Sequence, residues 1–249
     1  SVEYVADYFK WVGDTYGLNE FYVLDDIFLP NPERLEAYIR AFERRKLTVD
    51  IKCFLHPNTV KPNLLPLYKR LGVRVVSLGI ESGSNAILAK MGKRITTDVA
   101  RQAADDLHRF GFETNGLFML GHREETPETM RQTIDFVREL SPKLSSFWVS
   151  FMAPYPGTPM YDAGIDAYGR ILNADYSTWG NRYPVFLPKG VTYDQLMNAR
   201  AELVSVRRKL ERRKVVKTRG HAYYYYQRLK KTAKGAAQSM RRLAAGRTA

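Results

Sequence analysis

Five short apolar segments alternate with amphipathic segments along the first 153 residues, and this alternation limits the folds that the chain can adopt. The apolar segments predict β-strands at residues 20–24, 48–55, 73–80, 113–120 and 146–153. Continuous apolar strands separated by helices indicate a parallel sheet that helices cover. A doubly wound sheet and a barrel both fit this pattern.

Local signals predict where several helices begin and end. Asn31 followed by Pro32 is typical of a helix start, and Gly72 is typical of a helix end in the left-handed conformation. Thr192 and Gln195 form a capping box that opens a further helix. Residues 154–191, which are rich in Pro, Gly, Tyr and Asp, are expected to form loops with short elements.

Composition limits the class of protein. A chain of 249 residues with 45% hydrophobic residues can form one large α/β domain. It has no run of about 18 apolar residues and no signal-peptide pattern at its start. Its single cysteine, Cys53, rules out an internal disulfide framework, so we expect a reducing, cytoplasmic setting.

The net charge of +13 is concentrated near the C-terminus. Residues from Arg200 onward include sixteen Lys or Arg and two Asp or Glu, which leaves 23 basic and 24 acidic residues before Arg200. The body of the chain is therefore close to neutral, and the overall charge says nothing about its binding site.

Polar or glycine-rich clusters follow each predicted strand, where parallel α/β folds gather their functional residues. The clusters are DDIF (25–28), HPN (56–58), GIESGS (79–84), GHREET (121–126) and YPGT (155–158). His56 is expected to be a polar loop residue, and Cys53 a buried apolar one.

These clusters resemble those of the radical S-adenosylmethionine (SAM) superfamily, especially its cobalamin-associated branch. The resemblance covers residues 2–161 and rests on the ordered segments DDIF, SLGIESGSNAILAKMGKRIT, GLFMLGHREET and YPGTPMY. It implies a partial (β/α)6 barrel, similar to a TIM barrel, with strands two to six present and strand one expected before Ser1. We expect the barrel in residues 1–165, a C-terminal loop and helical region in 166–231, and a disordered basic tail in 232–249.

The resemblance also implies a set of SAM-binding residues. Asp25 and Asp26 would lie near the amino and carboxylate end of SAM, with only one of them facing it. Ser77, Glu81 and Ser82 would also lie near SAM, although Glu81 could instead hold the following loop. The segment with Gly121 and Glu125 would lie beside the adenine, but for Glu125 we favour a role in capping the next helix. No catalytic residue and no metal ligand is assigned.

The resemblance implies a [4Fe–4S] cluster held by a C-x-x-x-C-x-x-C loop, which this sequence does not contain, and cobalamin in an upstream domain. A radical SAM enzyme would also need a reductant such as flavodoxin or ferredoxin and would act on a small-molecule or lipid-like substrate. Our hypothesis is that this chain is inactive alone. The alternative is a cluster-less α/β barrel that acts as a non-catalytic binding module. A methylthiotransferase-like enzyme acting on RNA is disfavoured, because no strand-rich segment follows the barrel.

The basic segment 207–231 contains four consecutive tyrosines, at positions 223–226. Basic and aromatic residues together can bind nucleic acid or an anionic membrane surface. We favour a third interpretation, in which the segment is a helix whose charges are solvated. Contact with a membrane surface is the second choice. Nucleic acid is not an expected partner.

Overall fold

A computed structural model describes residues 1–162, 164–180 and 182–213. The helices are α1 (Val2–Tyr16), α2 (Pro32–Arg44), α3 (Leu65–Leu71), α4 (Asn85–Lys90), α5 (Thr97–Arg109), α6 (Pro127–Leu140), α7 (Pro159–Asp162) and α8 (Ile165–Tyr168), with 3-10 turns η1 (Pro57–Thr59) and η2 (Tyr176–Thr178). The strands are β1 (Glu20–Tyr22), β2 (Asp50–Leu55), β3 (Val73–Glu81), β4 (Glu113–Leu120), β5 (Ser146–Phe151), β6 (Gly169–Ile171) and β7 (Phe186–Pro188). Residues 193–213 are also helical.

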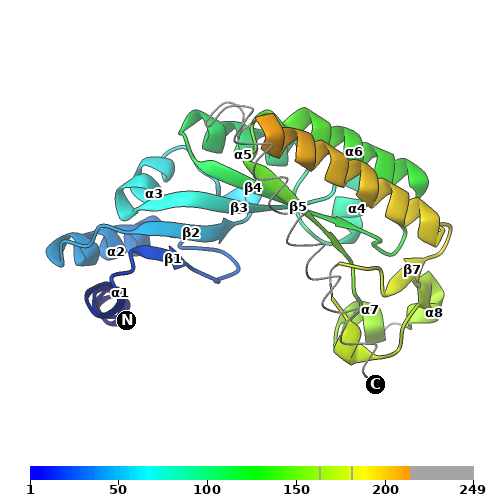
Figure 1. Cartoon of the computed structure of the whole chain (residues 1–249), viewed down its shortest axis with the longest axis horizontal. Helices are drawn as coiled ribbons and strands as arrows, with labels where there is room; N and C mark the ends of the chain where they lie inside the picture. The colour runs from blue at the N-terminus through cyan, green and yellow to red at the C-terminus, as the bar shows by residue number, and fades with distance from the viewer. Residues whose placement is uncertain (163, 181, 214–249) are drawn as a thin grey trace, which may run out of the picture. The chain divides into compact units, whose positions relative to one another are not determined.

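The central element is a parallel sheet with the strand order β1-β2-β3-β4-β5. Its strands curl into a half-barrel with helices packed around it (Figure 1). All five predicted strands are present, and each connection between them contains a helix. The predicted partial barrel, similar to a TIM barrel, is therefore confirmed.

The two faces of this sheet are buried to different degrees. In β4, Phe118 and Leu120 are almost fully buried, whereas their neighbours Leu117 and Met119 are half-buried. The strand β2 alternates in the same way. Successive side chains of a strand point to opposite faces, so helices cover one face and leave the other partly open. This differs from the expectation that helices cover the sheet.

Local signals set the helix ends as predicted. The Asn31 side chain accepts a hydrogen bond from the Arg34 amide at the start of α2. Gly72 ends α3 in the left-handed conformation, with φ 101°. The reciprocal hydrogen bonds between Thr192 and Gln195 confirm the predicted capping box.

The region after β5 contains α7, α8 and a small antiparallel pair, β6 with β7. The helix that begins at residue 193 then buries Leu196, Ala199 and Leu203. Arg131 of α6 forms an ion pair with Glu202, which ties this helix to α6.

Residues Ser1–Val206 form one compact unit, and Arg207–Ala249 form a second, of which the structure describes the helical residues 207–213. The four tyrosines and most of the basic tail lie outside the described residues. The domain boundaries at residues 165 and 231 and the role of the tail stay predictions. In the described part of the chain, no helix combines the length and apolar character needed to cross a membrane.

Candidate functional site

A cleft of about 390 Å³ lies where β1, β2 and β3 end. Its polar lining comes from five side chains on three strand ends and the loop after α4: Asp26, His56, Ser77, Glu81 and Lys93. Its apolar lining includes Phe54 and Leu117. The carboxyl ends of parallel strands are where α/β folds bind ligands, so we assign this cleft as the candidate site.

An ion pair between Glu81 and Lys93 is the main electrostatic feature of the cleft. The Lys93 Nζ lies 2.9 Å from Glu81 Oε1, and each side chain is 21% exposed. Glu81 has a φ of 69°, which is uncommon for a residue with a Cβ. The register between β3 and β4 shifts between Gly79 and Glu81, and such breaks in strand pairing re-aim side chains beside active sites.

Gly79 provides room beside this ion pair. A Cβ at position 79 would lie 3.0 Å from Glu81 Oε1 and 3.1 Å from Lys93 Nζ. A larger residue would therefore push against both charged groups. Because Gly79 has no side chain, its backbone can lie close to the charged atoms of Glu81 and Lys93, and a ligand could approach the backbone closely at this position.

His56 is held by both of its ring nitrogens. Its Nδ1 accepts a hydrogen bond from the Asn58 amide, and its Nε2 lies 3.2 Å from the Lys93 carbonyl oxygen. Because Nδ1 accepts, Nε2 carries the ring proton and donates a hydrogen bond to the Lys93 carbonyl oxygen. Burial and the nearby Lys93 charge lower the pKa of His56. His56 is thus a neutral ring that ties the β2 end to the loop holding Lys93, which fits the loop role expected for it.

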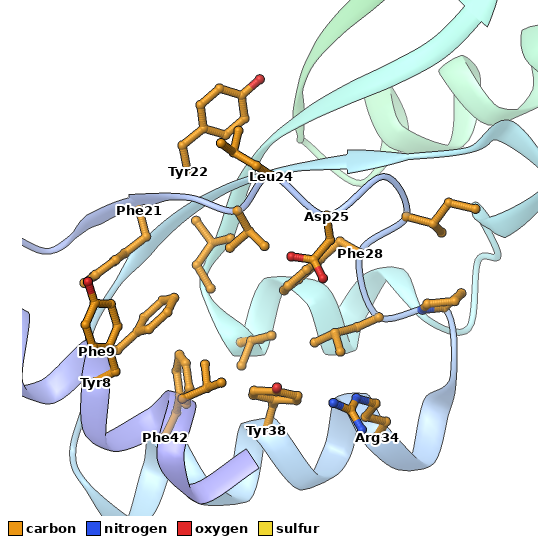
Figure 2. A pocket seen from close by; sticks show the side chains of 17 residues that line it. Tyr8, Phe9, Phe21, Tyr22, Leu24, Asp25, Phe28, Arg34, Tyr38 and Phe42 are labelled. Atoms are coloured by element: carbon orange, nitrogen blue, oxygen red, sulfur yellow. The ribbon is translucent and has the colours of Figure 1, made fainter. Parts of the chain in front are cut away.

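Asp25 and Asp26 line different pockets. Asp26 lines the cleft with Glu81 and Lys93. Asp25 lines an apolar pocket of about 590 Å³ beside α1 and α2, where it points toward Phe28 and Tyr38 (Figure 2). This geometry matches the expectation that the two neighbouring carboxylates diverge, and it selects Asp26 as the one that reaches the cleft.

Ser77 and Ser82 have different surroundings. Ser77 lines the cleft from β3. Ser82 is 1% exposed, and its hydroxyl pairs with Thr133 of α6 at 3.1 Å and accepts from the Ser84 amide. A Cβ at Gly83 would collide with α6 backbone, 2.6 Å from the Gln132 carbonyl oxygen. Ser82 and Gly83 therefore fasten the loop after β3 to α6, and the structure does not bring Ser82 into the cleft.

Glu125 holds the loop after β4. Its Oε2 accepts hydrogen bonds from the backbone amides of Gly121 (3.0 Å) and His122 (3.4 Å), and its Oε1 accepts one from the Thr129 hydroxyl (2.9 Å). It is 1% exposed, and burial raises its pKa. Thr126 and Thr129 form the capping box of α6. These contacts give Gly121 and Glu125 a structural role, and adenine contact stays a prediction.

The residues present do not fit an iron–sulfur cluster. Cys53 is fully buried in β2 on the helix-covered face, and burial raises the pKa of its thiol to about 12. A cluster needs several thiolates, and the sequence contains one cysteine. Among the described residues, no group of three or more His, Cys, Asp or Glu side chains could hold a metal ion.

Lys93 is the site residue that the sequence did not reveal. It lies in the segment SLGIESGSNAILAKMGKRIT, twelve positions after Glu81, and α4 separates the two residues. The signal available was the second lysine of the KMGK run, which follows a short helix and could return to the same strand end. Without the helix length, this return could not be predicted.

A curled parallel sheet with a polar cleft at its carboxyl edge defines an α/β-barrel enzyme architecture. The sequence profile of the Radical SAM superfamily matches residues 1–137. The chain therefore belongs to the radical SAM superfamily of enzymes, as the strand-end motifs predicted.

Two curated relatives extend the match beyond the barrel. An uncharacterized methyltransferase, PH0819, of Pyrococcus horikoshii is 29% identical over 196 residues, which is 79% of this chain and 42% of that protein. The anaerobic magnesium-protoporphyrin IX monomethyl ester cyclase of Cereibacter sphaeroides is 23% identical over 78% of this chain and 32% of its own length. The chain thus spans less than half the length of these relatives.

A solved structure with the same fold is the radical SAM methyltransferase TsrM from Kitasatospora setae, with cobalamin and a [4Fe–4S] cluster bound. It superposes with a TM-score of 0.65 at 16% identity, over 83% of this chain and 46% of that one. Another structure of TsrM, with tryptophan and a SAM analogue bound, has a TM-score of 0.66. At this identity the likeness concerns the fold.

Proposed function

We propose that the cleft at the ends of β1, β2 and β3 binds SAM, and that the whole protein is a radical SAM enzyme that performs radical chemistry or methyl transfer. The observation that carries the proposal is the charge pattern of the cleft. Two carboxylates, Asp26 and Glu81, and one ammonium, Lys93, line it together. SAM carries an ammonium, a sulfonium and a carboxylate, so its charges complement this set.

Each group has a distinct part in this proposal. The Asp26 carboxylate would accept hydrogen bonds from the ammonium of SAM, and Lys93 would bind its carboxylate. Glu81, which Lys93 now neutralises, would accept hydrogen bonds from ribose hydroxyls, as acidic residues do in dinucleotide-binding folds. Hydrogen bonds to charged groups are stronger than neutral ones, so these contacts would fix the orientation of SAM.

Radical cleavage of SAM needs an electron, and a reduced [4Fe–4S] cluster supplies it in this superfamily. Since Cys53 does not fit a cluster, we propose that the thiolates belong to a part of the protein outside these residues and that this chain alone does not cleave SAM. The relatives include named methyltransferases and a cyclase, which supports a catalytic role over a non-catalytic binding module. Cobalamin, flavodoxin and ferredoxin stay proposed partners of the whole protein.

The adjacent aspartates provide a matched test of the SAM site. We expect titration calorimetry with SAM to show binding to the full 249-residue chain. Asp26→Asn removes one charge-assisted contact, which is worth about 10-fold or more in affinity. Asp25→Asn removes the same charge one residue away, in the other pocket, and should leave the affinity within about twofold.

Lys93 provides a second pair of variants. Lys93→Met should weaken SAM binding by about 10-fold or more, because the SAM carboxylate loses its ammonium partner. Lys90→Met removes an exposed lysine that pairs with Glu124 outside the cleft and should not change the affinity. Equal effects within either pair, or no binding of SAM at millimolar concentration, would contradict the proposed site.

A cleavage assay tests the proposed inactivity. The purified chain, incubated with iron, sulfide, dithionite and SAM, should form no 5′-deoxyadenosine above the level of a protein-free control. Formation that depends on the chain would overturn the assignment of the thiolates to another part of the protein.

A further inference from the structure

The residues His56, Pro57 and Asn58, called the HPN turn below, join the end of β2 to the loop that carries Lys93. The His56 Nε2 donates to the Lys93 carbonyl oxygen at 3.2 Å, and the Asn58 Nδ2 donates to the Arg94 carbonyl oxygen at 2.9 Å. Two side chains of one turn therefore bind two consecutive carbonyl groups, which lie 37 and 36 positions away in the sequence. These contacts fix the loop at the residue whose side chain enters the cleft.

The HPN turn is held by its own hydrogen bonds. The Asn58 amide donates to His56 Nδ1 at 3.2 Å, and the Thr59 hydroxyl donates to the His56 carbonyl oxygen at 2.7 Å. Pro57 is buried and has a fixed φ angle. A turn that is constrained in this way can hold a second segment in place.

The loop after α4 needs such a support. The residues on both sides of Lys93 are left-handed, Gly92 with φ 66° and Arg94 with φ 55°. A residue with a Cβ is strained in that region and keeps this conformation only where its surroundings hold it. The Lys93 amide donates to the Leu88 carbonyl oxygen at the end of α4, and its carbonyl oxygen accepts from His56. The Lys93 backbone is therefore held from two sides.

The position of the Lys93 ammonium depends on this backbone. Lysine has a flexible stem of four carbons, so its Nζ stays 2.9 Å from Glu81 Oε1 only while the loop directs it there. A loop that is released from the HPN turn would place the ammonium in the cleft for part of the time. The apparent affinity of a ligand falls with the fraction of molecules that are ready to bind it.

We propose that His56 and Asn58 are positioning residues that hold the Lys93 ammonium ready for the SAM carboxylate, and that the HPN turn thereby makes the cleft select ligands with a carboxylate. The proposal rests on the proposed function, because it takes Lys93 as the partner of that carboxylate. Asn58 does not line the cleft, and both ring nitrogens of His56 are engaged within the protein. Both residues therefore act through Lys93, and no bond forms or breaks.

Three ligands test this selection by titration calorimetry with the full chain. SAM and S-adenosylhomocysteine both carry the carboxylate, whereas 5′-methylthioadenosine lacks the whole amino acid part. Asn58→Ala should weaken binding of the first two by about fivefold, because the loop loses one hydrogen bond. It should leave the affinity for 5′-methylthioadenosine within about twofold. Asn58→Asp, which has the same size but cannot donate, should weaken binding of the first two ligands at least as much as Asn58→Ala.

A matched control lies in the same stretch of chain. Asn63 is exposed between η1 and α3, and its side chain makes no hydrogen bond in the described part of the protein. Asn63→Ala should therefore leave the affinity for all three ligands unchanged. Circular dichroism verifies that each variant is folded.

His56 provides a pair of variants with a rescue. His56→Leu removes the donor to the Lys93 carbonyl oxygen and should weaken SAM binding by about fivefold. His56→Gln places an amide nitrogen near the position of Nε2, so it should retain most of the affinity. Equal losses in His56→Leu and His56→Gln would contradict the hydrogen bond as the cause.

A double-mutant cycle tests whether the HPN turn acts through Lys93. In the Lys93→Met background the ammonium is absent, so the position of the loop no longer affects the carboxylate. Asn58→Ala should then weaken SAM binding by less than about twofold, because residues that act as one unit are not additive. A full fivefold loss in that background would overturn the proposal.

Chemical labelling reports on Lys93 without any ligand. Tandem mass spectrometry measures the acetylation rate of Lys93, whose side chain is 21% exposed, relative to that of Lys90, which is 55% exposed. Asn58→Ala should raise this ratio by about threefold or more, since the released ammonium leaves Glu81 for part of the time. Asn63→Ala should not change it.

The outcomes separate this proposal from the proposed function. If SAM binds, but Asn58→Ala changes neither its affinity nor the labelling ratio, the SAM site stands and the positioning role fails. Equal weakening of SAM and 5′-methylthioadenosine would also overturn the proposal, because the effect would not concern the carboxylate. If SAM does not bind to the wild-type chain, the proposed function fails, and with it the selection of SAM by the HPN turn.

Discussion

Replacing Glu125 by alanine tests whether this residue holds the loop after β4 or contacts a ligand. In the structure its carboxylate accepts two backbone hydrogen bonds, from Gly121 and His122, and one from the Thr129 hydroxyl. The two backbone contacts are buried. In the Glu125→Ala variant both backbone amides lose their acceptor.

The expected cost follows from these contacts. A buried donor left without an acceptor costs about 1–3 kcal/mol. The His122 contact, at 3.4 Å, is the weaker of the two. Burial of the carboxylate opposes its charge, as its raised pKa shows, and the variant regains that penalty. We therefore expect the free energy of unfolding to fall by about 2 kcal/mol.

Urea unfolding at neutral pH measures this change. With a slope of about 2 kcal/mol per molar urea, the midpoint should fall by about 1 M. Glu125→Gln keeps an acceptor oxygen for both amides, so its free energy of unfolding should fall by less than half as much as that of Glu125→Ala. Glu128→Ala, an exposed first-turn glutamate of the same helix, should cost about 0.5 kcal/mol.

The reasoning is refuted if Glu125→Ala and Glu128→Ala shift the midpoint equally. A stable Glu125→Ala variant that has lost SAM binding would instead show that Glu125 contacts the ligand.

Three further predictions concern stability. Thr114 is fully buried, and its hydroxyl makes no hydrogen bond within the described chain, so Thr114→Val should raise the unfolding free energy by about 1 kcal/mol; a lower urea midpoint would contradict this. Gly72→Ala should lower the free energy of unfolding by about 3 kcal/mol or more, because a Cβ at position 72 would lie 2.3 Å from the Val49 carbonyl oxygen. Gly92→Ala, at a left-handed position with open space around it, should lower it by about 1 kcal/mol. Similar thermal midpoints for the two variants would contradict the steric argument. Burial lowers the pKa of His122 in the folded protein, so the unfolded chain binds the proton first, and stability should fall as the pH drops from about 7.5 to about 5.5. His122→Asn should make that fall smaller, and an unchanged pH dependence would show that His122 does not cause it.

Local features of this protein were predictable from the sequence, because each depends on a few neighbouring residues. The Asn31 cap, the left-handed Gly72 and the Thr192 capping box occur as predicted. All five strands were placed within a few residues, since their apolar segments are short and bounded by turns. The strand-end motifs likewise identified the superfamily, because their order and spacing reflect the barrel itself.

The tertiary structure decided which of the motif residues meet. Asp25 and Asp26 are adjacent in sequence, but the path of the loop after β1 sends one to an apolar pocket and the other to the cleft. Ser82 lies next to Glu81 but turns toward α6. Lys93 returns to Glu81 only because α4 has the length to bring it back.

The open face of the sheet shows the same division. The sequence by itself determined that β4 is a strand and that its residues alternate between two faces, because that period belongs to the extended backbone. It could not show that helices cover only one of those faces, since this depends on where the connections pack. For that reason Leu117, which the sequence places among the apolar strand residues, becomes part of the cleft lining only in the folded half-barrel.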